Sequence, residues 1–123
     1  MTDTVTFVTP PLGLGEHTQF ELDQVADSGS LFSLSALTDP NTRLFVVNPG
    51  DVLPDYEPAI TGAQADALGI QSADDAVLFV IARLADDGLG VNLLAPIVVN
   101  RHTGAAAQVI LDGQGYPVRA LLS

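Results

Sequence analysis

Cysteine is absent from this chain of 123 residues, which excludes disulfide bonds, thiolate metal ligands and a cysteine nucleophile. Lysine is absent too, so the four basic residues are all arginines, against 15 acidic residues and a formal net charge of -11. Nucleic acid and anionic membrane surfaces repel such a chain, and we expect no direct binding to either. The acidity favours steering toward a basic partner, although acidity can also serve solubility alone.

Long hydrophobic runs are also missing. The two longest, 76–82 and 93–99, have the length of strands and fall far below the ~20 residues of a membrane-spanning helix. Residues 1–4 carry no basic charge and precede no long apolar stretch, so no signal peptide is predicted. We therefore expect a cytoplasmic protein with a single domain over residues 1–123, a length that can bury a core without covalent staples.

Turn-forming residues recur at short intervals along the chain, and segments rich in Val, Phe, Ile and Leu lie between them. This spacing predicts an all-β protein, either a sandwich or a barrel. Residues 77–81 are continuously apolar, which indicates a central strand covered on both faces. Asp112-Gly113 suits a tight hairpin turn at the end of a strand over 105–111. The other expected strands lie within 4–9, 18–25, 31–34 and 44–47.

One short helix is expected near residues 62–68. Thr61 can cap its N-terminus, and the following residues are fair to good helix formers. Gly69 can end the helix in the left-handed conformation, and Ile70 supplies the apolar contact that often follows such an end.

Catalytic and cofactor motifs are weak or missing. His17 and His102 lie beside turn residues, and no His-x-His or His-x-x-x-His spacing offers two metal ligands from one element. No Gly-x-Ser-x-Gly nucleophile elbow is present. The acidic pairs at 74–75 and 86–87 are of the kind usually found solvated before a strand or in a turn. We therefore predict no catalytic residue, no cofactor and no metal site.

The segment 54–58 is the better candidate for binding a protein partner. It places Tyr56 between Asp55 and Glu57, with a proline at each end that restricts the backbone. Tyrosine is favoured at interfaces, so these three residues form a candidate acidic, aromatic contact surface. The alternative is a rigid loop whose tyrosine packs back on the domain. Arg101 and His102, at the tip of a predicted hairpin, are a second candidate contact.

The run 91–100 is apolar, contains Pro96, and has an asparagine near its start and another at its end. Proline cannot donate to a strand ladder, so this run indicates a specific local geometry rather than a regular central strand. Asparagine readily hydrogen-bonds nearby main chain, and we assign Asn92 and Asn100, with Pro96, a structural role.

Several blocks of the chain resemble the FliW family of bacterial flagellar assembly factors. Residues 92–100 carry the strongest likeness, and 44–49 followed by 54–57 matches the family's order of strand, proline and Pro-Asp-Tyr-Glu. The start, 11–16, is similar to the family's glycine-rich opening in altered form, and the chain lacks the tryptophan that many members have in the third strand. The likeness continues at Gly104, 108–111, Tyr116 and Arg119.

This resemblance implies a small antiparallel β-barrel-like domain without catalytic activity or cofactor. It implies two partners, the RNA-binding translational repressor CsrA and flagellin. Cytoplasmic flagellin would sequester the protein; once flagellin is exported, the freed protein would bind CsrA and relieve repression of flagellin mRNA. Two other readings stay open: a flagellin-dedicated chaperone without a CsrA arm, and a small-ligand barrel or enzyme with a deep polar pocket near His17 or His102.

Overall fold

The computed structural model describes residues 2–8, 16–25, 31–53, 56, 58, 60–86, 88–111, 113–117 and 119–122. The strands in this part of the chain are β1 (Thr2–Phe7), β2 (Gln19–Gln24), β3 (Leu31–Ala36), β4 (Asp39–Val47), β5 (Ala76–Ala85), β6 (Gly88–Val91), β7 (Ile97–Asn100), β8 (Ala105–Gln108) and β9 (Ala120–Leu122). The helices are α1 (Pro49–Val52), α2 (Gly62–Ala67) and the 3-10 turn η1 (Ala73–Asp75).

Within the described residues, seven strands close into a barrel. The ring runs β5-β4-β3-β2-β1-β8-β7 and returns to β5, because β5 pairs with both β4 and β7. All neighbours are antiparallel except β1 and β8, which run parallel with Thr6 opposite Ala105. β6 and β9 lie outside the ring and extend the sheet from the far end of β5. The predicted all-β, barrel-like fold is confirmed, with one parallel pairing that the sequence pattern did not indicate.

Apolar side chains pack in the interior of the barrel. Phe20, Val46 and Ile97 are fully buried there, and they come from three different strands. The rings of Phe7 and Phe20 meet edge to face with centroids 5.4 Å apart, a favourable geometry for aromatic pairs. Alternation along β1 places its apolar residues in this core and leaves Thr4 and Thr6 exposed, as its period of two requires.

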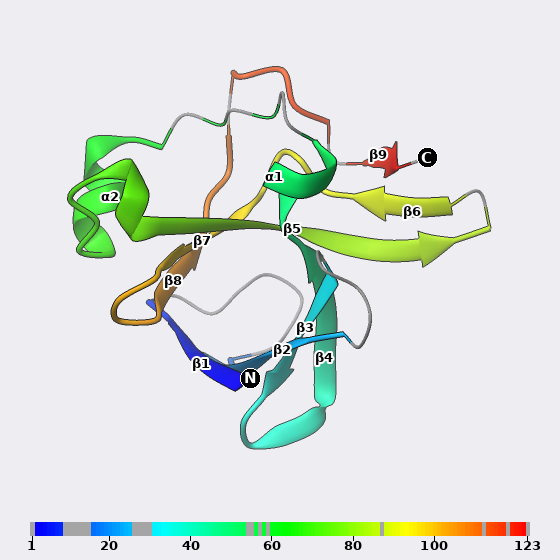
Figure 1. The fold of residues 1–123 in the computed structure, drawn as a ribbon, viewed down its shortest axis with the longest axis horizontal. Coiled ribbons are helices and arrows are strands. Elements are labelled where there is room, and N and C mark those ends of the chain that lie inside the picture. Colours follow the sequence, from blue (N-terminus) through cyan, green and yellow to red (C-terminus); the bar gives the residue numbers. More distant parts are fainter. Residues whose placement is uncertain are drawn as a thin grey trace.

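β5 is covered on both faces, as its unbroken apolar run predicted. Val77, Phe79 and Ile81 pack with the barrel interior. Leu78 and Val80 point the other way, into two clusters formed with segments outside the barrel wall. Figure 1 shows β5 running across the molecule, with α2 near its beginning and β6 and β9 near its end.

The short helix expected near 62–68 is present as α2. The Thr61 hydroxyl accepts from the Gln64 amide and the Gln64 side chain accepts from the Thr61 amide, which forms a capping box. Gly69 follows with φ +71°, the left-handed conformation expected for the stop. Residues 48–50 have an Asn-Pro-Gly sequence that favours a turn; in the structure they begin a second short helix, α1, where the Asn48 side chain accepts from the Gly50 amide.

The hairpin predicted at Asp112-Gly113 was wrong. β8 ends at Gln108, and the next strand along the chain, β9, pairs with β6 rather than with β8. Gly113 does have φ +76°, so it makes a turn, but that turn leads the chain across to the sheet extension. Asp112 itself lies outside the described residues.

Candidate partner-binding site

The proline-containing run 91–100 is not one strand but two, β6 and β7, separated by an excursion of the chain. Both pair with the same strand, since Val91 lies opposite Ala82 and Ile97 lies opposite Phe79. The five residues 92–96 therefore stand against two residues of β5, 80 and 81. This excursion sends β6 away from the barrel while β7 stays in the ring, and it removes the conflict between Pro96 and a regular ladder.

Side-chain and main-chain hydrogen bonds hold this excursion. The Asn92 carboxamide oxygen accepts from the amides of Leu94 and Ala95, both at 3.1 Å. The Pro96 carbonyl accepts from the Val109 amide at 2.9 Å, which ties the excursion to the segment after β8. Leu93, Ala95 and Pro96 are buried, so most of this segment is not accessible to a partner.

Tyr56 packs against the outside of the barrel wall. Its hydroxyl donates to the Leu93 carbonyl at 2.6 Å, and its ring meets Tyr116 edge to face at 4.7 Å between centroids. Burial, followed by the proximity of Tyr116, raises the pKa of the Tyr56 phenol well above its ordinary value. The side chain thus lies against the excursion and is only partly available to a partner. Asp55 and Glu57 lie outside the described residues.

Replacing Tyr56 by phenylalanine removes the hydrogen bond to Leu93 and keeps the ring contact with Tyr116. We expect the free energy of unfolding to fall by about 1 kcal/mol, the usual contribution of one hydrogen bond. Urea unfolding followed by circular dichroism measures this loss. An unchanged midpoint would mean that the hydroxyl is equally well satisfied by water.

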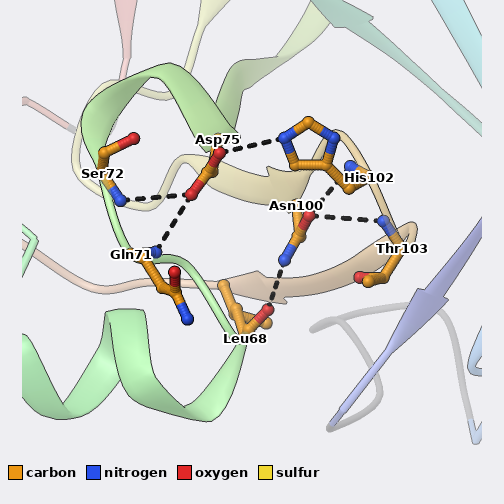
Figure 2. Close-up of polar contacts among 7 residues, drawn as sticks. All are labelled: Leu68, Gln71, Ser72, Asp75, Asn100, His102 and Thr103. Atoms are coloured by element: carbon orange, nitrogen blue, oxygen red, sulfur yellow. Dashed lines mark hydrogen bonds and ion pairs between the residues drawn. The ribbon is translucent and has the colours of Figure 1, made fainter.

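Asn100 links the turn between β7 and β8 to the end of α2. The side chain is buried, with 3% of its residue surface exposed. Its amide donates to the Leu68 carbonyl at 2.9 Å, and its oxygen accepts from the amides of His102 and Thr103. Figure 2 shows the Asn100 carboxamide between Leu68 on one side and the turn on the other. One side chain therefore fixes two segments that are 32 residues apart in the chain.

Asp75 joins this turn to the loop after α2. One carboxylate oxygen accepts from the amides of Gln71 and Ser72, and the other lies 2.9 Å from His102 Nε2. The Asp75 carbonyl also accepts from the Arg101 amide at 2.8 Å. The His102 hydrogen bond, and then the one from the Gln71 amide, lower the pKa of the Asp75 carboxyl; desolvation opposes them, and the Ser72 amide adds a further lowering. Figure 2 shows Asp75 between the loop and the histidine ring.

The lowered pKa of Asp75 predicts an acid-dependent contribution to stability. A carboxyl whose folded pKa is depressed stabilises the fold above its unfolded pKa, and this contribution is lost as the pH falls through the folded value. In His102→Ala, we expect the folded pKa of Asp75 to move up toward its unfolded value, so the stabilising contribution is smaller and its loss is complete at a higher pH. Carbon-13 NMR titration of the Asp75 carboxyl measures this pKa in the wild type and in the variant. His17→Ala is the matched control and should leave Asp75 unchanged, since His17 approaches Asp39 instead.

Of the remaining predicted contacts, Arg101 and His102 are exposed on the turn, and the structure brings them beside Asp75. The His102 side chain has 64% of its surface exposed, so it can meet a partner while it holds Asp75. Tyr56 instead contacts the excursion, through its hydrogen bond to the Leu93 carbonyl. The described members of the two candidate surfaces therefore belong to separate networks.

A groove beside α2 was not anticipated from the sequence. It encloses about 490 Å³ over the outward faces of β5 and β7, and Leu78 and Val98 are among its lining residues. Ile60 and Ile70, which flank α2 in the chain, also line it. The sequence signal for this groove was the presence of apolar residues on both sides of a short helix. The groove itself forms only because segments distant in the sequence come together, and the sequence pattern does not specify this.

Titratable side chains do not gather into a metal-type cluster in the described residues, where no three His, Asp or Glu side chains come together. A depression of about 210 Å³ lies beside His17, lined also by Glu16, Thr18, Gln19 and Thr38.

Within the described parts of the chain, no helix is both long and apolar enough to cross a membrane.

A family model described as FliW protein matches residues 1–122 of this chain. The chain belongs to the FliW family. The likeness extends to three dimensions: the crystal structure of a flagellar assembly factor FliW matches with a TM-score of 0.89 and 30% sequence identity, over 97% of this chain and 84% of that chain.

Curated FliW relatives match in sequence as well. The flagellar assembly factor FliW of Caldicellulosiruptor bescii is 33% identical over 98 residues, which cover 78% of this chain and 64% of the relative. FliW of Bacillus subtilis is 29% identical over 109 residues, which cover 87% of this chain and 76% of the relative. The match thus spans less than two thirds of the Caldicellulosiruptor protein. Residues 92–100, which carry the strongest sequence likeness to the family, form the excursion and β7.

Proposed function

We propose that this FliW-family protein is a cytoplasmic flagellar assembly factor that binds a CsrA-type RNA-binding repressor and relieves repression of flagellin mRNA. Flagellin in the cytoplasm sequesters it and so couples repression to flagellin export. The observation that carries the proposal is the structural likeness, over 97% of this chain, to a protein described as flagellar assembly factor FliW. The role is binding rather than catalysis.

Electrostatics support a basic partner. A repressor that binds RNA presents positive charge to the phosphate backbone, and this chain carries a formal net charge of -11. Opposite net charges raise the rate of encounter between two proteins, most strongly at low salt. The same charge disfavours direct contact with RNA, so the protein acts on the repressor and not on the message.

Calorimetric titration into the CsrA homologue of the same organism, at two salt concentrations, tests the proposal. We expect saturable binding that weakens as salt screens the charges. Binding to flagellin without binding to the repressor would instead support a flagellin-dedicated chaperone. Binding to neither, together with binding of a small ligand near His17, would support the small-ligand barrel.

The predicted contacts within this function are Asp55, Tyr56 and Glu57, with Arg101 and His102 as the second set. Neutralising the two acids together, as Asp55→Asn with Glu57→Gln, should weaken repressor binding and flatten its salt dependence. The same titration measures both effects. Unchanged affinity and unchanged salt dependence would exclude this loop from the interface.

A further inference from the structure

The groove beside α2 is a gap in the cover over β5. At Val80 and Ala82, the outward face of this strand is buried under side chains from the segments outside the barrel wall. At the groove, Ile60, Ile70, Ala76 and Leu78 are only half-buried. An apolar concavity of about 490 Å³ lined by these residues favours an apolar side chain from outside, because that side chain would remove the remaining apolar surface from water.

We propose that this groove receives an apolar side chain of the basic, RNA-binding repressor, carried on a segment with flanking Lys or Arg residues. This inference rests on the proposed function and adds the place of contact. Two exposed acids adjoin the groove: Asp66 follows the lining residue Ala65 on α2, and Asp74 lies in η1 between Ser72 and Ala76, which both line it. Their charge is complementary to a basic segment.

Charge also separates the repressor from other occupants. A second copy of this chain carries the same net charge of -11, so two acidic rims would repel each other. A repressor that binds RNA is basic as a condition of its own function, whereas flagellin has no such requirement. The observations therefore favour the repressor over a second copy and over flagellin.

Asp75 holds the wall of the groove in place. Gln71 and Ser72 line the groove, and their amides donate to the Asp75 carboxylate. The same carboxylate contacts His102 on the exposed turn between β7 and β8. The groove wall and the turn that carries Arg101 and His102 are thus parts of one hydrogen-bonded unit. A partner bound in the groove would therefore lie beside these two residues, which were predicted from the sequence as a second contact.

Two tryptophan variants on α2 test the groove directly. Ala65 lines the groove, and Ala65→Trp would place an indole ring in it. Ala67 is exposed on the same helix and is not among the lining residues, so Ala67→Trp is the matched control. In calorimetric titrations with the purified CsrA homologue, we expect Ala65→Trp to weaken binding by about tenfold or more and Ala67→Trp to change it by less than about twofold. Circular dichroism confirms that both variants fold.

Two charge reversals separate local contact from general steering. Asp74→Lys and Asp86→Lys change the net charge equally, but the residues flank opposite ends of β5, about 30 Å apart at the usual rise of a strand. We expect Asp74→Lys to weaken repressor binding several-fold more than Asp86→Lys does. Equal effects of the two reversals would overturn the placement of the basic segment at this rim.

The outcomes distinguish this inference from the function on which it rests. If the wild-type protein and Ala65→Trp bind the repressor equally well, the groove is not the contact site, and the proposed function is unaffected. Loss of flagellin binding in Ala65→Trp with repressor binding retained assigns the groove to flagellin and overturns the inference. Wild-type protein that does not bind the repressor overturns both proposals.

Discussion

Replacing Gly104 by alanine is expected to lower the free energy of unfolding by about 3–4 kcal/mol, the largest effect predicted for a single residue here. Gly104 has φ +80°, and a Cβ built on it would lie 2.6 Å from the carbonyl oxygen of Thr4. The obstacle is backbone rather than a movable side chain. Gly104 also accepts from the Thr6 amide at 2.9 Å, so relief of the clash would pull apart the start of the parallel pairing between β1 and β8.

Gly113→Ala is the matched control for this effect. Gly113 has a similar φ of +76°, but nothing lies within 4 Å of an added Cβ. It should therefore show the backbone strain alone, about 1 kcal/mol. Thermal unfolding separates the two variants by roughly 10 °C for a domain of this size. Equal losses in both variants would show that the approach of Thr4 to Gly104 contributes nothing.

Replacing Asn100 by alanine is expected to cost about 2–3 kcal/mol. The Leu68 carbonyl loses its donor in a buried place, and the amides of His102 and Thr103 lose their common acceptor. Because Asn100 joins α2 to the β7–β8 turn, hydrogen exchange should accelerate in both segments. Acceleration confined to the turn would contradict the link to Leu68.

Asn100→Asp refines this test. It keeps the acceptor for the two turn amides but loses the donor to Leu68, and it buries a carboxylate in a position only 3% exposed. Burial raises the folded pKa of such a carboxyl above its unfolded value. The penalty is therefore full at neutral pH and shrinks as the pH falls through the raised folded pKa. Urea unfolding as a function of pH measures this trend; a variant whose deficit relative to wild type does not change with pH would contradict it.

Local signals in the sequence were sufficient for several elements. The unbroken apolar run 77–81 predicted a strand buried on both faces, and β5 has that environment because barrel and outer layer pack on opposite sides of it. Thr61 and Gly69 predicted the limits of α2, since capping depends on residues within a few positions of the helix end.

The candidate sites depend on contacts that sequence patterns do not specify. The hydrogen bond from Asn100 to Leu68 spans 32 residues, and the groove needs β5, β7 and α2 to meet. Tyr56 had two interpretations from sequence, outward contact or packing on the domain. Its hydroxyl donates to Leu93, 37 residues away, so a distant part of the chain determines its orientation. Pro96 indicated an irregular geometry, but the pairing of β6 and β7 with one strand fixes the form of the excursion.

We propose that this FliW-family protein relieves repression of flagellin mRNA by binding the repressor. Fluorescence anisotropy of a labelled flagellin-leader RNA bound to the CsrA homologue tests it most directly. We expect that adding this protein lowers the anisotropy to that of free RNA and that adding flagellin then restores it. Anisotropy that stays at the value of the repressor–RNA complex at saturating protein would contradict the account.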